Sequence, residues 1–225
     1  ANAQWQIRAL ADFDRDGDRV LDVGTGTGAL AAALEKAGPA VQVVGIDPSE
    51  GFIGFARKNA RSPQLSFELG DAQALKFPDA SFDATMALLV MNFVPDHVKA
   101  INEMRRVTRA QGTVAACVWD YDAGMEMLRF FWDEVVAMDP KMEPRDERHM
   151  KLSRRGQLAN LWTQAGLVDV EEKPLSINQN YASFQDYWEP FLKGAGPGGA
   201  YVTSLTDAKR DDLEKRIRAR VLGGQ

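Results

Sequence analysis

Short apolar runs alternate with amphipathic segments along the first half of the chain. Two of the runs, VQVVGI and TVAACVW, are apolar almost throughout, as strands buried on both faces should be. Strands that alternate with helices are typical of a parallel sheet covered on both sides. The pattern therefore predicts an α/β fold with a doubly wound, mostly parallel sheet. Its strands are predicted at Arg19–Val23, Val41–Ile46, Leu65–Leu69, Phe82–Leu89 and Gly112–Trp119.

Local signals predict where the intervening helices begin and end. The first helix covers Gly28–Ala37 and stops at Gly38–Pro39, a pair that ends helices. The second covers Ser49–Ala60, with Ser49 as its N-cap. Asp96 is expected to cap a third helix, whose apolar residues recur at helical spacing as far as Val107.

The alternation of short apolar runs with amphipathic segments ends near Tyr121. A helix is predicted over Glu126–Met138, followed by a charged, proline-containing connection or lid. Ser153 is expected to cap the next helix, which runs through Ala165, and a sixth strand is predicted over Leu167–Ile177.

The last part of the chain reads as cap helices. Ser183–Asp186 matches a capping box and opens a short aromatic helix. Gly194–Gly199 is predicted to be a mobile loop, and Thr206 starts the final helix. We therefore divide the chain into a core over residues 1–120 and a remainder over residues 121–225. The remainder would belong to the same domain and carry the sixth strand and the lid or cap helices.

Composition excludes several classes of protein. The 225 residues are 45% hydrophobic and 26% charged, with a net charge of −5, which argues against broad nucleic-acid binding. No apolar run approaches the roughly 20 residues that span a bilayer. The single cysteine, Cys117, forms no intramolecular disulfide and is compatible with a cytoplasmic protein.

The first strand runs directly into glycines, in the stretch VLDVGTGTGAL from Val20 to Leu30. Glycine costs folding entropy, so three of them at alternate positions indicate a close approach of backbone to a ligand. A strand, a glycine turn and a helix N-terminus together form an anion- or nucleotide-binding geometry. The stretch also satisfies the dinucleotide pattern G-x-G-x-x-G/A, and a tight turn is the simpler alternative.

Aspartates stand at the ends of three successive strands. Asp47 ends the second strand, where a carboxylate accepts hydrogen bonds from ribose hydroxyls. Asp71 leaves the third strand, a position at which dinucleotide enzymes have no general need for a carboxylate. Asp22 orienting the turn, Asp47 capping the next helix and Asp71 forming an Asx-turn are the structural alternatives. Three carboxylates at the edge where open sheets bind ligands favour a ligand site.

Five stretches together resemble the class I S-adenosylmethionine-dependent methyltransferases: VLDVGTGTGAL, VVGIDPS, GDAQALKFPDASFD, LLVMNFVPD and RVTRAQGTVAACVWD. They look most like the small-molecule branch that includes the ubiquinone and menaquinone biosynthesis methyltransferases. The resemblance implies a Rossmann-like fold, S-adenosylmethionine as cofactor, S-adenosylhomocysteine as product and no metal. It covers roughly residues 20–120.

The resemblance also implies roles for residues of the core. The loop of Asp22, Gly24, Thr25, Gly26 and Gly28 would surround the methionine and ribose portions, with Asp22 near the ammonium group. Beyond the loop, the resemblance implies that Asp47 binds the ribose hydroxyls and that Pro48 and Ser49 lie beside the adenine. It implies that Asp71 accepts a hydrogen bond from the adenine amino group, with Ala72 adjacent. Leu88 and Leu89 would lie along the methionine moiety.

The sequence indicates the catalytic base less clearly than any other part of the site. The sulfonium of the cofactor activates its methyl group, so the protein positions the acceptor and, for a carbon or hydroxyl nucleophile, supplies a base. Asn92 stands where many relatives carry a histidine, and it would hydrogen-bond the substrate without accepting its proton. His149 is the alternative, as a lid base or as part of a solvated connection. His97 is expected to be exposed or to cap a helix.

Aromatic residues of the second half are candidates for the walls of an apolar substrate pocket, with core packing as the alternative. These candidates are Trp119, Tyr121, Tyr187 and Trp188. The family fold closes with a seventh strand, and a leading helix covers its cofactor. No seventh strand is predicted here, and the leading segment, Asn2–Leu10, is short. We therefore expect the chain to be trimmed at both ends, or disordered parts of it to have been left out. If it is complete, the cofactor site would be more open than usual.

The sequence thus favours a methyltransferase acting on a small, partly apolar molecule. One alternative is a protein that binds S-adenosylmethionine or S-adenosylhomocysteine without catalysis. An NAD(P)-dependent oxidoreductase is the other, and it offers no role for Asp71.

Overall fold

The computed structural model describes residues 17–37 and 40–223, which form two units. The first unit contains the described residues up to Val118 together with residues 156–175. The second contains residues 119–155 and the described residues from Ser176 onward. The predicted helix end at Gly38–Pro39 and the leading segment Asn2–Leu10 lie outside the described residues.

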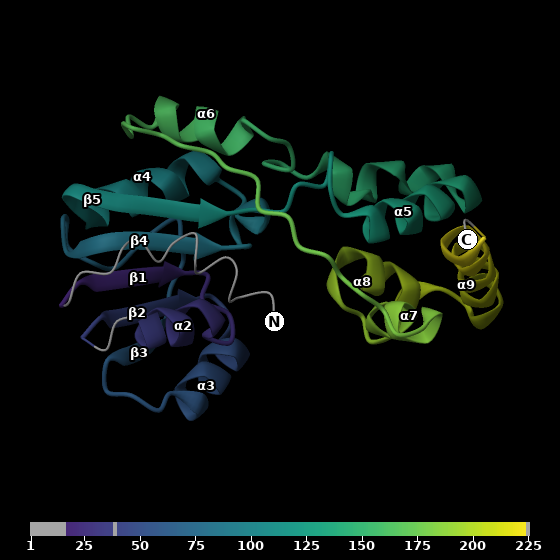
Figure 1. Ribbon diagram of the computed structural model, residues 1–225, viewed down its shortest axis with the longest axis horizontal. Helices are drawn as coiled ribbons and strands as arrows, with labels where there is room; N and C mark the ends of the chain where they lie inside the picture. Colours follow the sequence, from purple (N-terminus) through teal and green to yellow (C-terminus); the bar gives the residue numbers. More distant parts are fainter. Residues whose placement is uncertain (1–16, 38–39, 224–225) are drawn as a thin grey trace. The chain divides into compact units, whose positions relative to one another are not determined.

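In the described part of the first unit, five parallel strands form one sheet in the order β3-β2-β1-β4-β5 (Figure 1). The chain moves outward from β1 in one direction through β2 and β3, then returns to place β4 and β5 on the other side. Because such crossovers are right-handed, this reversal puts helices on both faces. The predicted doubly wound α/β fold is confirmed. The strands are β1 (Arg19–Val23), β2 (Gln42–Asp47), β3 (Leu65–Leu69), β4 (Phe82–Leu88) and β5 (Thr108–Cys117).

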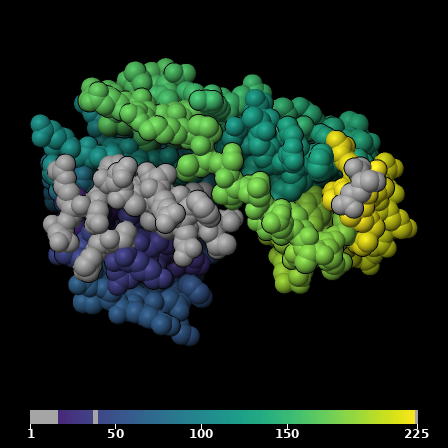
Figure 2. Space-filling model, viewed as in Figure 1, coloured from purple at the N-terminus to yellow at the C-terminus, as the bar shows by residue number. Residues whose placement is uncertain are grey.

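Four helices accompany this sheet in the described residues: α2 (Ala29–Ala37), α3 (Glu50–Asn59), α4 (His97–Val107) and α6 (Gln157–Gln164). One hydrophobic cluster joins the sheet residues Val20 and Met86 to Leu30 of α2 and Ile53 of α3. Side chains alternate across a strand, so Leu21 faces the layer opposite to the one that Val20 faces. The outer side of α3 lies at the surface of the unit (Figure 2).

The fifth strand begins earlier than predicted, at Thr108 instead of Gly112. The pairing with β4 shifts between Phe82 and Ala84, where Gln111 adopts a positive φ of 62°. An added Cβ at Gly112 would lie 2.6 Å from the Asp83 carbonyl oxygen, so the irregularity brings the two backbones into close contact. Such a bulge depends on contacts between strands and leaves no periodic signal.

The predicted sixth strand is wrong. Residues 167–177 are all described, and none of them belongs to a strand. Val168 is 81% exposed and Leu175 is 48% exposed, so the alternating apolar residues do not cover a core. Asp169 has a positive φ of 52°, which interrupts the extended conformation that a strand requires.

The second unit is built around aromatic side chains from four helices. The Phe131 and Phe191 rings stack with their centroids 4.5 Å apart, and Trp132 and Trp188 are almost completely buried. The helices are α5 (Glu126–Met138), α7 (Phe184–Leu192), α8 (Gly196–Ser204) and α9 (Asp207–Leu222), and the short 3-10 helices η3 (Pro140–Arg145) and η4 (Glu147–His149) follow α5. The helices over Glu126–Met138, after Ser183 and after Thr206 are confirmed.

Two predictions for this half are wrong. Most of the expected glycine loop is the start of α8, because Gly198 packs against the Phe131 and Phe191 rings and Gly199 against the backbone of Gly194. Ser153 caps no helix, because its buried hydroxyl donates a hydrogen bond to the Arg148 carbonyl oxygen. Helix α6 begins after Gly156 instead. None of the helices in the described part of the chain combines the length and apolar character needed to cross a bilayer.

Two glycine substitutions test how tightly the sheet is packed. A Cβ at Gly45 in β2 would lie 2.6 Å from Cδ1 of Phe67 and 2.7 Å from Oγ1 of Thr25. We expect Gly45→Ala to lower the free energy of unfolding by about 1–3 kcal/mol. Gly54→Ala is the control, because Gly54 lies in α3 with nothing within 4 Å of an added Cβ. This change should stabilise the protein by about 0.5–1 kcal/mol. Urea denaturation checks both, and equal effects would contradict the expectation.

Candidate functional site

The candidate site lies where the parallel strands end, beginning with the glycine loop after β1. Gly24, Gly26 and Gly28 have φ values of 70°, 55° and 86°, which other residues rarely adopt. At Gly24 the space is also closed, since an added Cβ would lie 2.4 Å from Cγ2 of Val90. The Thr25 N–H donates to the Ile46 carbonyl oxygen at 2.8 Å, which anchors the loop on β2.

Asp47 joins the glycine loop to the start of α3. Its Oδ2 accepts a hydrogen bond from the Gly26 N–H at 3.0 Å, and its Oδ1 accepts one from the Ser49 N–H at 2.9 Å. The Ser49 hydroxyl in turn accepts from the Phe52 N–H, which caps α3 as predicted. Each carboxylate oxygen of Asp47 retains a further lone pair, so the residue can also accept hydrogen bonds from two neighbouring hydroxyl groups.

Asp22 is a completely buried carboxylate at the end of β1. Its Oδ2 accepts a hydrogen bond from the Thr25 hydroxyl at 2.6 Å, whereas its Oδ1 has no hydrogen-bond partner among the described residues. Burial raises the pKa of Asp22 to about 7. Hydrogen bonds from the Thr25 hydroxyl and the Ala31 N–H oppose this rise, and the charge of Asp47 adds the smallest contribution to it. A buried carboxylate oxygen that lacks a hydrogen-bond partner is suited to a cationic group.

Asp71 lies after β3 and is exposed. Its Oδ1 accepts hydrogen bonds from the Gln73 backbone N–H at 2.8 Å and from Gln73 Nε2 at 3.1 Å. These hydrogen bonds lower the pKa of Asp71 below its ordinary value, with the backbone N–H contributing most. The Asx-turn weighed from the sequence therefore exists, and the acceptors that the turn does not use remain available to a ligand. Ala72 is half-buried beside it.

The end of β4 completes this edge of the sheet. Leu88 and Leu89 are half-buried, and Leu89 has a positive φ of 57° that is held by a hydrogen bond from its N–H to the Cys117 carbonyl oxygen at 2.8 Å. Asn92 follows in the short helix η2 (Met91–Phe93) and is buried. His97 is buried too, so the exposed position expected for it is wrong.

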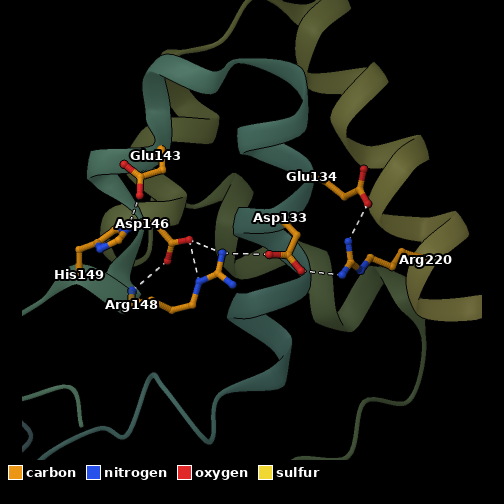
Figure 3. Close-up of polar contacts among 7 residues, drawn as sticks. All are labelled: Asp133, Glu134, Glu143, Asp146, Arg148, His149 and Arg220. Carbon is orange, nitrogen blue, oxygen red and sulfur yellow. Dashed lines mark hydrogen bonds and ion pairs between the residues drawn. The ribbon is translucent and has the colours of Figure 1, made fainter.

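The remaining candidates belong to the second unit. His149 Nε2 lies 2.7 Å from Oε1 of Glu143, and both side chains are about half exposed (Figure 3). Tyr187 and Trp188 lie within the aromatic core, where the Trp188 indole N–H has no hydrogen-bond partner among the described residues. Tyr121 is buried and Trp119 half-buried. Contact of these four aromatic residues with a substrate stays a prediction.

Two further residues at this edge were not predicted from the sequence. Val90 fills the space above Gly24, and Gln73 holds Asp71 while its Oε1 accepts from the Asp96 N–H at 3.0 Å. The Asx-turn pattern gave a partial signal for Gln73, because the residue two positions after an aspartate supplies the backbone N–H.

Comparison with known proteins identifies the family. A profile described as a methyltransferase domain matches residues 21–116. The chain is 31% identical over 176 residues to the demethylmenaquinone methyltransferase of Geobacillus kaustophilus. This alignment covers 72% of this chain and 75% of that protein. The chain belongs to the class I S-adenosylmethionine-dependent methyltransferases. This confirms the family resemblance drawn from the motifs.

Other methyltransferases align over a shorter part of the chain. The demethylmenaquinone methyltransferase of Thermus thermophilus is 39% identical over 116 residues, covering 50% of this chain and 52% of that protein. The enzyme of the same name from Deinococcus radiodurans is 46% identical over 112 residues, covering 48% and 46%. The chain thus spans about half the length of these curated relatives.

Solved structures of other proteins show the same fold. A proposed methyltransferase from an antibiotic biosynthesis pathway of Anabaena variabilis superposes with a TM-score of 0.66 at 19% identity, over 100% of this chain and 90% of that one. The YcgJ protein of Bacillus subtilis superposes with a TM-score of 0.61 at 21% identity, over 94% and 88%.

The residues at the sheet edge fit S-adenosylmethionine, the cofactor of this methyltransferase family. The cofactor carries an ammonium group, for which Oδ1 of Asp22 is a buried acceptor without another partner among the described residues. It also carries two ribose hydroxyls, for which Asp47 has one free acceptor on each oxygen. The adenine amino group is a donor suited to a carboxylate such as Asp71.

The raised pKa of Asp22 predicts how stability depends on pH. The folded state retains the Asp22 proton up to about pH 7, whereas the unfolded chain loses it near the ordinary value of 3.8. Stability contributed by this group is therefore lost as the pH rises through that window. Asp22→Asn does not titrate, so its stability relative to wild type should increase between about pH 5 and pH 8, by about 1 kcal/mol or more.

Urea denaturation at several pH values measures this difference. Asp211→Asn, at an exposed position of α9, is the control and should show no comparable trend. A stability difference between Asp22→Asn and wild type that does not change with pH would contradict the expectation.

Proposed function

We propose that this protein is an S-adenosylmethionine-dependent methyltransferase that acts on a small, partly apolar molecule. The observation that carries the proposal is the completely buried Asp22 carboxylate, whose Oδ1 has no partner among the described residues. A protein gains nothing in stability from such a group, because a buried anion without full hydrogen bonding is unfavourable. Its presence beside a glycine loop and Asp47 is explained by a cationic nucleoside ligand.

Each part of the ligand has a proposed partner. Asp22 would receive the ammonium group, and the glycine loop would allow the methionine portion to approach the backbone. Asp47, already oriented by the Gly26 and Ser49 N–H groups, would receive the ribose hydroxyls. Pro48, Ser49, Asp71 and Ala72 would surround the adenine, and Leu88 and Leu89 would lie along the methionine moiety.

The chemistry follows from the cofactor, whose sulfonium makes the methyl group an activated electrophile. What the protein has to supply is orientation of the acceptor and exclusion of water. The relatives named demethylmenaquinone methyltransferases support an acceptor of the same kind, an aromatic ring with an apolar substituent. We propose Asn92 as a hydrogen-bonding group for this acceptor, His149 as the candidate base, and Trp119, Tyr121, Tyr187 and Trp188 as candidate pocket residues. We also propose that the protein is located in the cytoplasm.

Calorimetric titration with S-adenosylhomocysteine tests the cofactor site. We expect micromolar binding to the wild-type protein and no binding of NADH. Asp47→Ala should weaken binding at least about tenfold, because hydrogen bonds to a charged group contribute about 1.5–3 kcal/mol each. The exposed substitution Asp211→Ala changes the net charge equally and should leave binding unaffected. Binding of NADH, or equal binding by Asp47→Ala, would overturn the proposed site.

Turnover separates the enzyme from a protein that only binds the cofactor. The protein should transfer a labelled methyl group from S-adenosylmethionine to reduced demethylmenaquinone with a short side chain, detected by mass spectrometry as one added methyl. Cofactor binding without transfer to this compound or to a panel of other small aromatic acceptors would favour the non-catalytic alternative.

A further inference from the structure

The side chain of Gln73 connects two loops at the carboxyl edge of the sheet. Its Nε2 donates to Oδ1 of Asp71 at 3.1 Å, in the loop after β3. Its Oε1 accepts from the Asp96 N–H at 3.0 Å, at the start of α4. Since Asp71 offers only acceptors and the Asp96 N–H is only a donor, the two contacts determine the orientation of the Gln73 amide group.

The orientation of the Asp71 carboxylate depends on Gln73, because the Asp71 side chain is exposed. An exposed aspartate side chain samples several rotamers, and ordering it for a ligand costs conformational entropy. Gln73 donates to Oδ1 of Asp71 twice, from its backbone N–H at 2.8 Å and from its side chain. The carboxylate is therefore held in one orientation before any ligand binds.

The second contact of Gln73, with the Asp96 N–H, fixes the position of its amide group. Asp96 is the N-cap of α4, and its Oδ1 accepts from the Lys99 N–H at 3.0 Å. Because the Gln73 Oε1 is bonded to the backbone of this cap, its amide is positioned by the first turn of a helix instead of by the loop alone.

We propose that Gln73 is a positioning residue that gives the site its preference for adenine, by holding the Asp71 carboxylate toward the exocyclic amino group of the base. The inference rests on the proposed function, since it requires an adenosyl ligand near Asp71. A carboxylate held in this orientation accepts a hydrogen bond from an amino group and is repelled by a carbonyl oxygen at the same position. The site should therefore discriminate against hypoxanthine, in which that carbonyl replaces the amino group.

Two substitutions separate this role from a purely structural one. Gln73→Glu retains an acceptor for the Asp96 N–H and the backbone donor to Asp71, but it removes the side-chain donor and places two carboxylates together. Gln73→Met removes both side-chain contacts without adding charge. Gln42→Glu, at an exposed position at the opposite end of the sheet, is the control for the change of charge.

The experiment is a calorimetric titration of each protein with S-adenosylhomocysteine and with its deaminated analogue, S-inosylhomocysteine. The wild-type protein and Gln42→Glu should prefer the adenine ligand by about tenfold or more, as expected for one hydrogen bond to a charged group. Gln73→Glu and Gln73→Met should reduce this preference by about fivefold or more through weaker binding of the adenine ligand alone. Thermal unfolding of each variant checks that it is folded.

The outcomes distinguish the two proposals. If wild type binds S-adenosylhomocysteine and both Gln73 variants retain the full preference, the role of Gln73 is wrong and the proposed function stands. Equal weakening of both ligands also overturns it, because that result indicates a structural effect. If the wild-type protein binds neither ligand, the proposed function fails and the role of Gln73 fails with it.

Discussion

The buried carboxylate of Asp22 is the constraint on which the candidate site of the first unit depends. Burial without full hydrogen bonding is costly, and the pKa of about 7 reflects that cost. The Thr25 hydroxyl offsets part of it by donating to Oδ2 at 2.6 Å. Thr25 can do so only because the glycine loop turns back toward β1 and is anchored on β2. The apolar strands on both sides of Asp22 supply the stability that such an unfavourable group requires.

The loops that follow the strands are held together by contacts between loops. Val90, after β4, occupies the space above Gly24, so the glycine loop and the β4 loop pack against each other. Asp47 bonds the glycine loop to α3, and Gln73 bonds the β3 loop to the start of α4. These contacts order the loops of the candidate site in the absence of a ligand, which would reduce the entropy lost on binding one.

Local sequence signals predicted the elements whose cause is local. The glycine turn and the Ser49 and Asp96 caps are determined by residues close in the chain, and all three form. The errors lie where distant contacts decide. Gly198 joins a helix because it fits against Phe131 and Phe191, although glycine alone disfavours helices. Residues 167–177 alternate like a strand, but Val168 and Leu175 are exposed instead of covering a core, and the segment remains irregular.

The buried carboxylates of the second unit differ from Asp22 in their hydrogen bonding. In the second unit, Asp146 is paired with Arg148, which also reaches Asp133 at 2.9 Å, and Arg220 bonds the same aspartate at 2.6 Å (Figure 3). Buried Glu147 accepts from the Trp132 indole N–H at 2.9 Å. Because both of these buried carboxylates have partners within their own unit, their charges are explained by folding alone. Asp22 differs, because its Oδ1 has no hydrogen-bond partner among the described residues, and this difference supports the proposed ligand site.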